Sequence, residues 1–274
     1  EVWWLKDKRI RNQMLITDKR QIAMIRNEGI QQIWIDIDKS VQAPAKPAPK
    51  KAIPQTPFFK ELDQAQAIFN QGKPQVLAMF NEARMGQGLD LDYTMDLVDE
   101  IAGSITREPT ALLSVARLKN HDDYTYLHSM AVCGLMISLG KKMGLDEHQQ
   151  RRVGMGGLLH DVGKSAVPLE ILNKPGKLTE EEFTVMRQHP IVGAQMLMEA
   201  DAGEDLLDIA LHHHEKFDGS GYPHGQKAEE ISLFSRMAAV CDVYDAVTSN
   251  RPYRKGWTPA EAMHNMLSWR GHFD

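Results

Sequence analysis

The alternation of hydrophobic and polar residues separates a short N-terminal part from a long helical part. Within residues 1–40, Thr17 or Asp18 can cap a short helix that Gly29 would end. Isoleucines then alternate with tryptophan or aspartate over residues 33–38, which is the period of a strand. We therefore expect a small N-terminal α/β domain, with a regulatory role, over residues 1–40.

A proline-rich segment follows this domain. Residues 41–57 carry five prolines among alanines and lysines. Proline lacks the backbone N–H that helices and central strands need, so neither element is expected here. The composition predicts an extended linker over residues 41–57.

From Phe58 onward the apolar residues recur with the period of a helix. Gly72 and Pro74 interrupt the pattern, so we expect one helix over residues 58–71 and a second over 74–85. A third helix fits residues 90–106. Together they form a helical segment, residues 58–118, that leads into the main domain.

The next helices are expected to form the core. Residues 124–143 are apolar on nearly all sides, which predicts a buried helix. Asp146 can cap the following helix, which should run to about Leu159. Close packing is expected to offset the low helix propensity of three glycines in it, Gly154, Gly156 and Gly157.

Capping signals locate the later helices. Thr179 with Glu182, and Thr258 with Glu261, form the pattern of a capping box. Another helix is expected over residues 232–248. The predicted fold class is therefore mainly α, with a small α/β piece at the N-terminus.

Composition and charge limit the classes of ligand and location. The net charge of −5 and pI of about 6.1 offer no basic field for long nucleic acids, so a nucleotide ligand would need local charge from a metal or a few arginines. The two cysteines lie in apolar runs, which favours a reducing, cytoplasmic location without disulfides. No apolar run of about 18 residues and no signal peptide are found, so membrane insertion is not expected. The first residue is not methionine, and both ends are expected to be trimmed.

Histidines and aspartates recur at the ends or in the middle of apolar helices. Burying one unpaired imidazole costs roughly 1–3 kcal/mol, so several such groups are tolerated if they converge on a cation. Imidazole and carboxylate ligands without thiolate suit Fe, Mn, Ni, Co or Zn. Seven ligands are more than one tetrahedral ion can bind, but they suit two ions about 4 Å apart. The seven residues are His128, His160, Asp161, His189, His213, His214 and Asp242.

Each of these residues also has a simpler interpretation. His128 alone is more often a hydrogen-bonded core histidine, and His189 before Pro190 could merely end a helix. His212–His214 could be a solvated helix end, and Asp242 could pair with an arginine, Arg236 or Arg251. The run His160-Asp161-Val162-Gly163-Lys164 is more specific. Two ligands, a flexible turn and a cation together make a phosphate site.

Two motifs resemble the signatures of the HD-GYP family. The first is His160-Asp161-Val162-Gly163-Lys164, and the second is the stretch from His213-His214-Glu215 to Gly221-Tyr222-Pro223. Residues 242–254 also resemble the family's next segment, and residues 1–40 more weakly resemble a small domain ahead of some members. The resemblance implies an all-helical HD-domain bundle over residues 119–274. It also implies hydrolysis of a cyclic dinucleotide, cyclic di-GMP or 3',3'-cyclic GMP-AMP.

The resemblance also assigns the metal ligands. It implies that all seven residues above bind metal and that Asp161 bridges two ions. Some relatives bind a third metal through a glutamate one helical turn before the first histidine. Tyr124 stands at that position here, so we expect two divalent transition-metal ions.

The implied reaction is in-line attack of a metal-bridging hydroxide on phosphorus, giving a linear dinucleotide. Lys164 is the expected phosphate contact or proton source for the leaving group; its simpler role is a solvated loop lysine. Arg251 and Arg254 would clamp the other phosphate, unless they pair with acidic neighbours instead, Asp245 or Glu261. Tyr222 would offer a stacking face to a base or to a signalling protein. Asp245 fits a residue that orients a ligand.

Two other functions compete with this interpretation. One is an HD-type phosphohydrolase acting on a mononucleotide or an alarmone, which the complete Gly-Tyr-Pro segment disfavours. The other is a catalytically silent sensor that binds a cyclic dinucleotide and signals through residues 1–40. Silent relatives lose ligands, whereas every ligand that aligns is kept here. The choice between cyclic di-GMP and cyclic GMP-AMP, and the identity of the metal, stay open.

Overall fold

A computed structural model describes residues 16, 19–27, 30, 57–117, 124–249 and 255–274 of the chain. The chain divides into two units, Glu1–Ala52 and Ile53–Asp274. In the first unit the described element is helix α1, Lys19–Asn27, where a helix was predicted. The expected strand over residues 33–38 and nearly all of the linker lie outside the described residues. The predicted domain boundaries therefore stay predictions.

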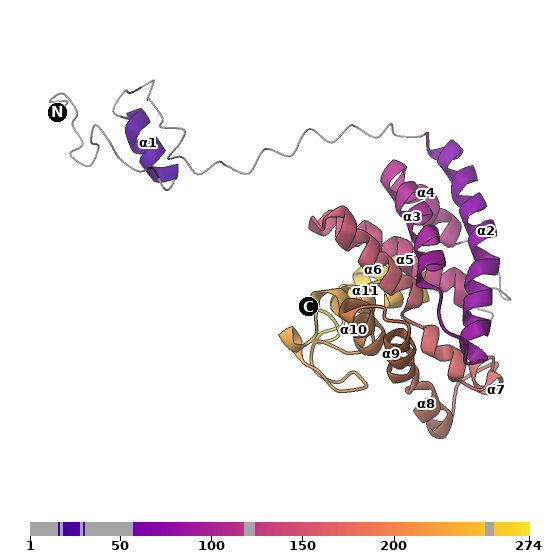
Figure 1. Ribbon diagram of the computed structural model, residues 1–274. Coiled ribbons are helices and arrows are strands. Elements are labelled where there is room, and N and C mark those ends of the chain that lie inside the picture. Colours follow the sequence, from indigo (N-terminus) through magenta and orange to yellow (C-terminus); the bar gives the residue numbers. More distant parts are fainter. Residues whose placement is uncertain (1–15, 17–18, 28–29, 31–56, 118–123, 250–254) are drawn as a thin grey trace. The chain divides into compact units, whose positions relative to one another are not determined.

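The second unit is helical, and no strand occurs among its described residues. The prediction of a mainly α fold is confirmed. Figure 1 shows the helices packed around α5 and α6, with α2 along one side. They are α2 (Phe58–Arg84), α3 (Leu91–Arg107), α4 (Pro109–Ala116), α5 (Tyr124–Met143), α6 (Glu147–Leu159), α7 (Leu169–Leu172), α8 (Glu180–Met186), α9 (His189–Glu199), α10 (Glu204–His212), α11 (Leu233–Thr248) and α12 (Pro259–Ser268), with 3₁₀ turns η2 (Val162–Ala166) and η3 (Ala228–Glu230).

The predicted break near Pro74 is wrong, because α2 runs unbroken from Phe58 to Arg84. Its buried face continues in helical register through Phe69, Gly72 and Val76. A Cβ on Gly72 would lie 2.8 Å from side-chain atoms of Leu97 and Met130, so the helix packs closely on α3 and α5 there. This tertiary burial outweighs the roughly 3 kcal/mol penalty of an internal proline.

Close packing around the glycines of α6 is confirmed. A Cβ on Gly157 would lie 3.0 Å from the backbone of Cys133 in α5, and a Cβ on Gly154 would lie 2.7 Å from Ile137. A Cβ on Gly156 would overlap the side chain of Ile209 in α10. The missing side chains thus let α6 approach both neighbours, and α6 can carry its last residues into the centre of the bundle.

Caps mark the starts of several helices that carry site residues. Asp146 caps α6 in a full capping box, and the helix ends at Leu159, immediately before His160. The boxes predicted at Thr179 and Thr258 are both present. Ser232 caps α11, which carries Asp242 on its inner part. Local sequence signals therefore determine where α6, α8, α11 and α12 begin.

Helix α2 is tied to the turn that carries Lys164. The guanidinium of Arg84 donates to the carbonyl oxygen of Val167 at 3.0 Å and to that of Lys164 at 3.5 Å. Near its other end, the fully buried Glu61 accepts two hydrogen bonds of 2.8 Å from Arg107 of α3. Residues 58–107 therefore pack as part of the same unit as the HD motif.

We predict that a chain beginning at Phe58 folds and keeps the phosphodiesterase activity that the resemblance implies. A chain beginning at Glu108 should do neither. The longer form retains α2, α3 and the Arg84 contacts; the shorter form removes them and exposes the apolar faces that they cover. Thermal unfolding and turnover of both forms would test this. An inactive or insoluble form beginning at Phe58 would show that residues 1–57 belong to the catalytic unit.

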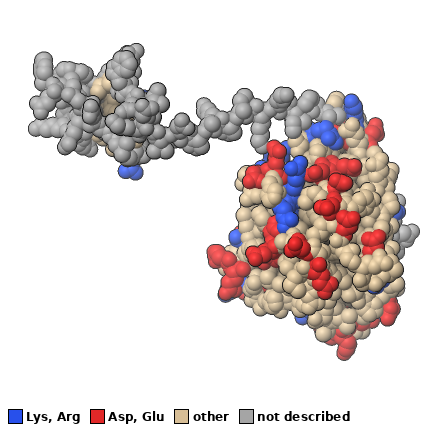
Figure 2. Space-filling model, viewed as in Figure 1, with Lys and Arg blue, Asp and Glu red and all other residues tan. Residues whose placement is uncertain are grey.

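The surface of the larger unit is mixed in charge. Figure 2 shows acidic side chains spread over the visible face and basic ones gathered in a short band. A face of this kind offers little to the phosphate backbone of a long nucleic acid. Among the described residues, no helix is both long enough and apolar enough to cross a membrane.

Candidate metal centre

Five segments of the second unit converge on one buried cluster. The second turn of α5, the end of α6, the start of α9, the end of α10 and the inner part of α11 each supply a histidine or an aspartate. The structure brings all seven predicted residues together. Within each of two groups the potential ligand atoms lie within 4.8 Å of one another: Asp161, His189, His213 and His214 in one, and His128, His160 and Asp242 in the other.

Backbone carbonyls orient three of the histidines. Nδ1 of His160 lies 2.7 Å from the oxygen of Gly157, and Nδ1 of His189 lies 2.7 Å from that of Met186. Nδ1 of His213 lies 2.9 Å from the oxygen of the residue three positions earlier. A carbonyl only accepts, so each Nδ1 carries a proton and Nε2 is the nitrogen left to bind a cation. Helical geometry thus presents three ring nitrogens that could bind a metal.

His128 lies between two aspartates of α11. Its Nδ1 is 2.6 Å from Oδ2 of Asp245, and its Nε2 is 3.0 Å from Oδ1 of Asp242. Burial lowers the pKa of His128, but hydrogen bonds to both carboxylates outweigh burial and raise it to about 9. Asp245 therefore orients His128, the kind of role expected from the sequence. A divalent ion would take the place of the proton on Nε2, since binding to histidine releases a proton.

In the other group, the imidazoles of His213 and His214 are neutral. Burial, reinforced by neighbouring histidines, lowers the pKa of His213 to about 4 and that of His214 well below its usual range. Nε2 of His189 and Nε2 of His213 lie only 3.3 Å apart. Two ring nitrogens this close together are an arrangement that a shared cation stabilises.

Asp161 lies at the centre of the cluster. Its Oδ1 is 3.3 Å from Nε2 of His189, and its Oδ2 is 3.4 Å from Nε2 of His160 and 3.7 Å from Nε2 of His128. Burial raises the pKa of Asp161, but Lys164, with its Nζ 2.5 Å away, and His160 more than offset this, so the group stays a carboxylate. The two oxygens therefore face the two groups of histidines.

Two buried polar atoms test whether the cluster fits a metal. Oδ1 of Asp161 and Nε2 of His160 have no hydrogen-bond partner within the part of the chain that the structure describes. Both residues are about 1% exposed, and leaving buried polar atoms unsatisfied costs roughly 1–3 kcal/mol each. A cation bound to them removes that cost, so the residues fit a metal centre.

Gly163 allows the turn between Asp161 and Lys164, called the HD turn below, to lie directly on α9. A Cβ at this position would overlap the carbonyl oxygen of His189 and would lie 2.5 Å from the backbone nitrogen of Gly193. The glycine of the His-Asp-Val-Gly-Lys motif thus serves a close backbone approach. This contact sets Asp161 and Lys164 beside the first residue of α9.

The cluster is open on one side. His214 and Asp242 have side chains that are 23% and 13% exposed, and that of Lys164 is 23% exposed. The Tyr222 ring lies 4.8 Å from the His214 ring with a tilt of 30°. A substrate would therefore approach past His214, Lys164 and Tyr222.

Glu215 holds the Gly-Tyr-Pro loop beside this opening. Its Oε1 accepts hydrogen bonds from the backbone N–H groups of His224 at 2.7 Å and Gly225 at 3.1 Å. The N–H of Tyr222 donates to the carbonyl oxygen of His214 at 3.2 Å. Sequence reasoning assigned Glu215 no role. Its place directly after two histidines, inside the loop motif, is the signal that could have suggested one.

Other predicted residues fall outside the cluster. Arg251 and Arg254 lie outside the described residues. His212 pairs with Asp208 and does not join either group of ligands. Arg236, a possible partner of Asp242, binds Asp274 at 2.6 Å instead.

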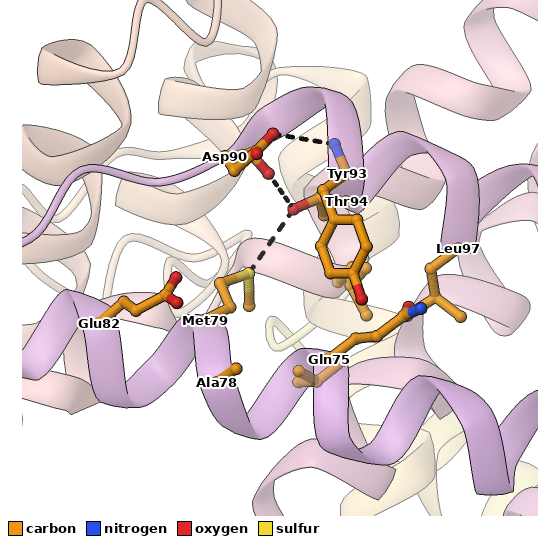
Figure 3. Close-up of a pocket in the computed structure, with 10 residues that line it drawn as sticks. Gln75, Ala78, Met79, Glu82, Asp90, Tyr93, Thr94 and Leu97 are labelled. Carbon is orange, nitrogen blue, oxygen red and sulfur yellow. Dashed lines mark hydrogen bonds between the residues drawn. The ribbon is translucent and has the colours of Figure 1, made fainter.

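A second hollow lies between α2 and α3, away from the histidines. Figure 3 shows its lining by residues such as Met79, Glu82, Tyr93 and Thr94. No histidine lines it, and its nearest approach in sequence to the cluster is Leu158, two residues before His160. This hollow therefore offers none of the chemistry of the metal centre.

Known proteins share this architecture and these motifs. A family model described as an HD domain matches residues 107–274, and one described as a domain of unknown function (DUF3391) matches residues 1–94. The solved structure of Bd1817, an HDG"Y"P protein from Bdellovibrio bacteriovorus, superposes with a TM-score of 0.64 at 22% identity. It covers 78% of this chain and 69% of that one, which shows a common fold.

Three curated relatives are similar in sequence. Cyclic di-GMP phosphodiesterase PA4108 of Pseudomonas aeruginosa is 46% identical over 96% of this chain and 67% of its own length. The cyclic di-GMP phosphodiesterase response regulator RpfG of Xanthomonas campestris is 41% identical, over 60% of this chain and 44% of its own. The 3'3'-cGAMP-specific phosphodiesterase 1 of Vibrio cholerae is 37% identical, over 57% of this chain and 36% of its own length.

The chain thus spans two thirds of the first relative and less than half of the other two. The HD-domain match covers more than half of the chain and includes the entire cluster of histidines and aspartates. The chain belongs to the HD-domain family, in the HD-GYP group whose two motifs it carries.

Proposed function

We propose that this chain is a metal-dependent phosphodiesterase that hydrolyses a cyclic dinucleotide to a linear one. The observation that carries the proposal is the pair of adjacent ligand groups with the ammonium of Lys164 beside them at the open side. The relatives named for cyclic di-GMP and for 3'3'-cGAMP support both as candidate substrates.

The seven clustered residues would hold two divalent transition-metal ions, with Fe, Mn, Ni, Co and Zn as candidates. Asp161 would serve both ions, which its two oxygens facing different histidines supports. When bound, such ions lower the pKa of water and offset negative charge on phosphoryl oxygens. The protein's own part is to orient the imidazoles and to keep most of them away from water.

Lys164 and Tyr222 would act at the open side. The partly exposed ammonium of Lys164 can contact a phosphoryl oxygen or give a proton to the departing oxygen. Tyr222 would border the substrate, either at a base or as a contact for a signalling protein. Arg251 and Arg254 stay predicted phosphate contacts from the sequence alone.

The proposal can be tested by metal analysis and product chromatography. The purified chain is expected to contain about two transition-metal ions and to convert cyclic di-GMP or cyclic GMP-AMP into a linear dinucleotide. Prior removal of metal by a chelator should abolish the product, and adding Mn²⁺ or Fe²⁺ should restore it. Tight binding without turnover in the metal-loaded chain would identify a sensor instead. Turnover of mononucleotides alone would identify a different phosphohydrolase.

We also predict that Lys164→Ala lowers kcat with little change in KM, because its charge is best used where negative charge develops. Arg251→Ala and Arg254→Ala should instead raise KM by about ten- to a hundredfold with kcat nearly unchanged. Steady-state kinetics with metal counts would test all three. Because Lys164 pairs with Asp161, a loss of metal in Lys164→Ala would assign Lys164 to metal retention rather than to chemistry.

A further inference from the structure

An arginine that sequence reasoning passed over lies beside the open side of the cluster. Arg187 follows α8 and is exposed to solvent. Its Cζ lies 4.5 Å from the ring centre of Phe183 and 5.3 Å from that of Tyr222. Two aromatic rings therefore hold the guanidinium at the surface, next to the Gly-Tyr-Pro loop.

Several other arginines of this unit have polar partners. Arg107, Arg151 and Arg152 bind carboxylates, and Arg84 binds two carbonyl oxygens. Within the described part of the chain, Arg187 has aromatic contacts but no acidic or carbonyl partner. Its N–H groups are thus available to a ligand, which distinguishes it from these structural arginines.

Tyr222 links this guanidinium to the metal centre. The same ring that contacts Arg187 lies 4.8 Å from the ring of His214, the most exposed member of the ligand cluster. Burial, followed by the charges of Asp161 and Asp242, raises the pKa of the Tyr222 hydroxyl, as expected for a group close to both carboxylates. Arg187 therefore lies at the mouth of the site but separate from its ligands.

The contacts of the guanidinium leave it able to bind an anion. Its Cζ lies over the rings of Phe183 and Tyr222, and these contacts use none of the N–H donors of its fork on a carboxylate or a carbonyl oxygen. Such a fork donates two parallel hydrogen bonds to phosphate oxygens. Because the aromatic contacts already order the side chain, less entropy is lost when it binds.

We propose that Arg187 binds the second phosphodiester of the cyclic dinucleotide, the one that the metal centre does not cleave. This rests on the proposed function. A cyclic dinucleotide carries two phosphodiesters, and the ligand cluster with Lys164 accounts for one. Arg187, one aromatic ring away from His214, offers the other a cationic contact, in addition to the contacts predicted for Arg251 and Arg254.

The test compares substrates with two phosphodiesters and with one. Arg187→Ala should raise KM for cyclic di-GMP, cyclic GMP-AMP and cyclic di-AMP alike, by about ten- to a hundredfold, with kcat nearly unchanged. Hydrolysis of bis(para-nitrophenyl) phosphate, which has a single phosphodiester, should be unaffected. Arg187→Lys should recover part of the affinity, because it keeps the charge but loses the fork.

Arg151→Ala is the matched control, because it removes an exposed arginine paired with Asp99. It should leave every KM unchanged, and all variants should keep their metal. Unchanged KM in Arg187→Ala, or an equal loss with the single phosphodiester, would overturn the proposal. A loss confined to guanine-containing substrates would overturn it too, in favour of a contact with the base. If the unaltered chain cleaves only the single phosphodiester, the proposed function itself fails, and the role of Arg187 fails with it.

Discussion

Replacement of Asp161 with alanine is expected to remove both metal ions and to lower turnover by about a thousandfold or more. Each of its oxygens faces a different group of histidines, so the loss of one side chain affects both groups at once. Bound metal contributes several kcal/mol to the stabilisation of a phosphoryl transition state, and each 1.36 kcal/mol is about tenfold in rate. Elemental analysis and turnover of the purified variant measure both effects.

Two further variants separate metal binding from general damage to the fold. Asp161→Asn keeps the size of the side chain but removes its charge, so it should also lose metal while retaining the fold by circular dichroism. Asp99→Ala breaks an exposed pair with Arg151 and should keep metal and activity, since such pairs contribute about 0–1 kcal/mol. Full metal content and turnover in Asp161→Ala would rule out a shared two-metal centre.

Much of the candidate site could be predicted because its chemistry is written in short local motifs. His160 and Asp161 are adjacent, as are His213 and His214, and each pair ends a helix whose start carries a clear cap or acidic first turn. The burial cost of isolated imidazoles and carboxylates then required the pairs to converge. Their meeting in two groups follows from the same residues.

Contacts between distant segments could not be predicted in the same way. Pro74 has an unfavourable local propensity, and only packing against Leu97 and Met130 shows why α2 continues through it. The support that Arg84 gives to Lys164 spans 80 residues of sequence. Arg187 is one of many surface cations until the fold places Tyr222 against it. Propensity and periodicity report on neighbours along the helix and carry no information about such pairs.

Gly163 shows how a motif residue can be identified from sequence while its physical reason needs the structure. In the sequence it reads as a flexible turn between Asp161 and Lys164. In the structure its Cα lies so close to α9 that backbone atoms of His189 and Gly193 occupy the space of a side chain. The requirement is therefore for space between two backbones rather than for flexibility.

Gly163→Ala is accordingly expected to lower both stability and metal affinity. The added methyl group meets backbone rather than a flexible side chain, so the HD turn and the first turn of α9 must move apart. Overpacking of this kind costs about 1–3 kcal/mol, and each kcal/mol lowers Tm by about 2–4 °C in a unit of this size. This movement would separate Oδ1 of Asp161 from Nε2 of His189, which lie 3.3 Å apart in the unaltered chain. A displacement of about 1 Å at a reacting centre can lower the rate a hundredfold.

Gly88→Ala is the matched control, because a Cβ there would meet nothing within 4 Å. It should leave Tm, metal affinity and turnover unchanged. Metal titration followed by calorimetry, with turnover at saturating metal, would separate the effects in Gly163→Ala. A lower Tm with normal metal affinity would mean that α9 adjusts without moving His189. An unchanged Tm and unchanged affinity would show that the two backbones are not in the contact described, and that the glycine of the motif serves only the turn.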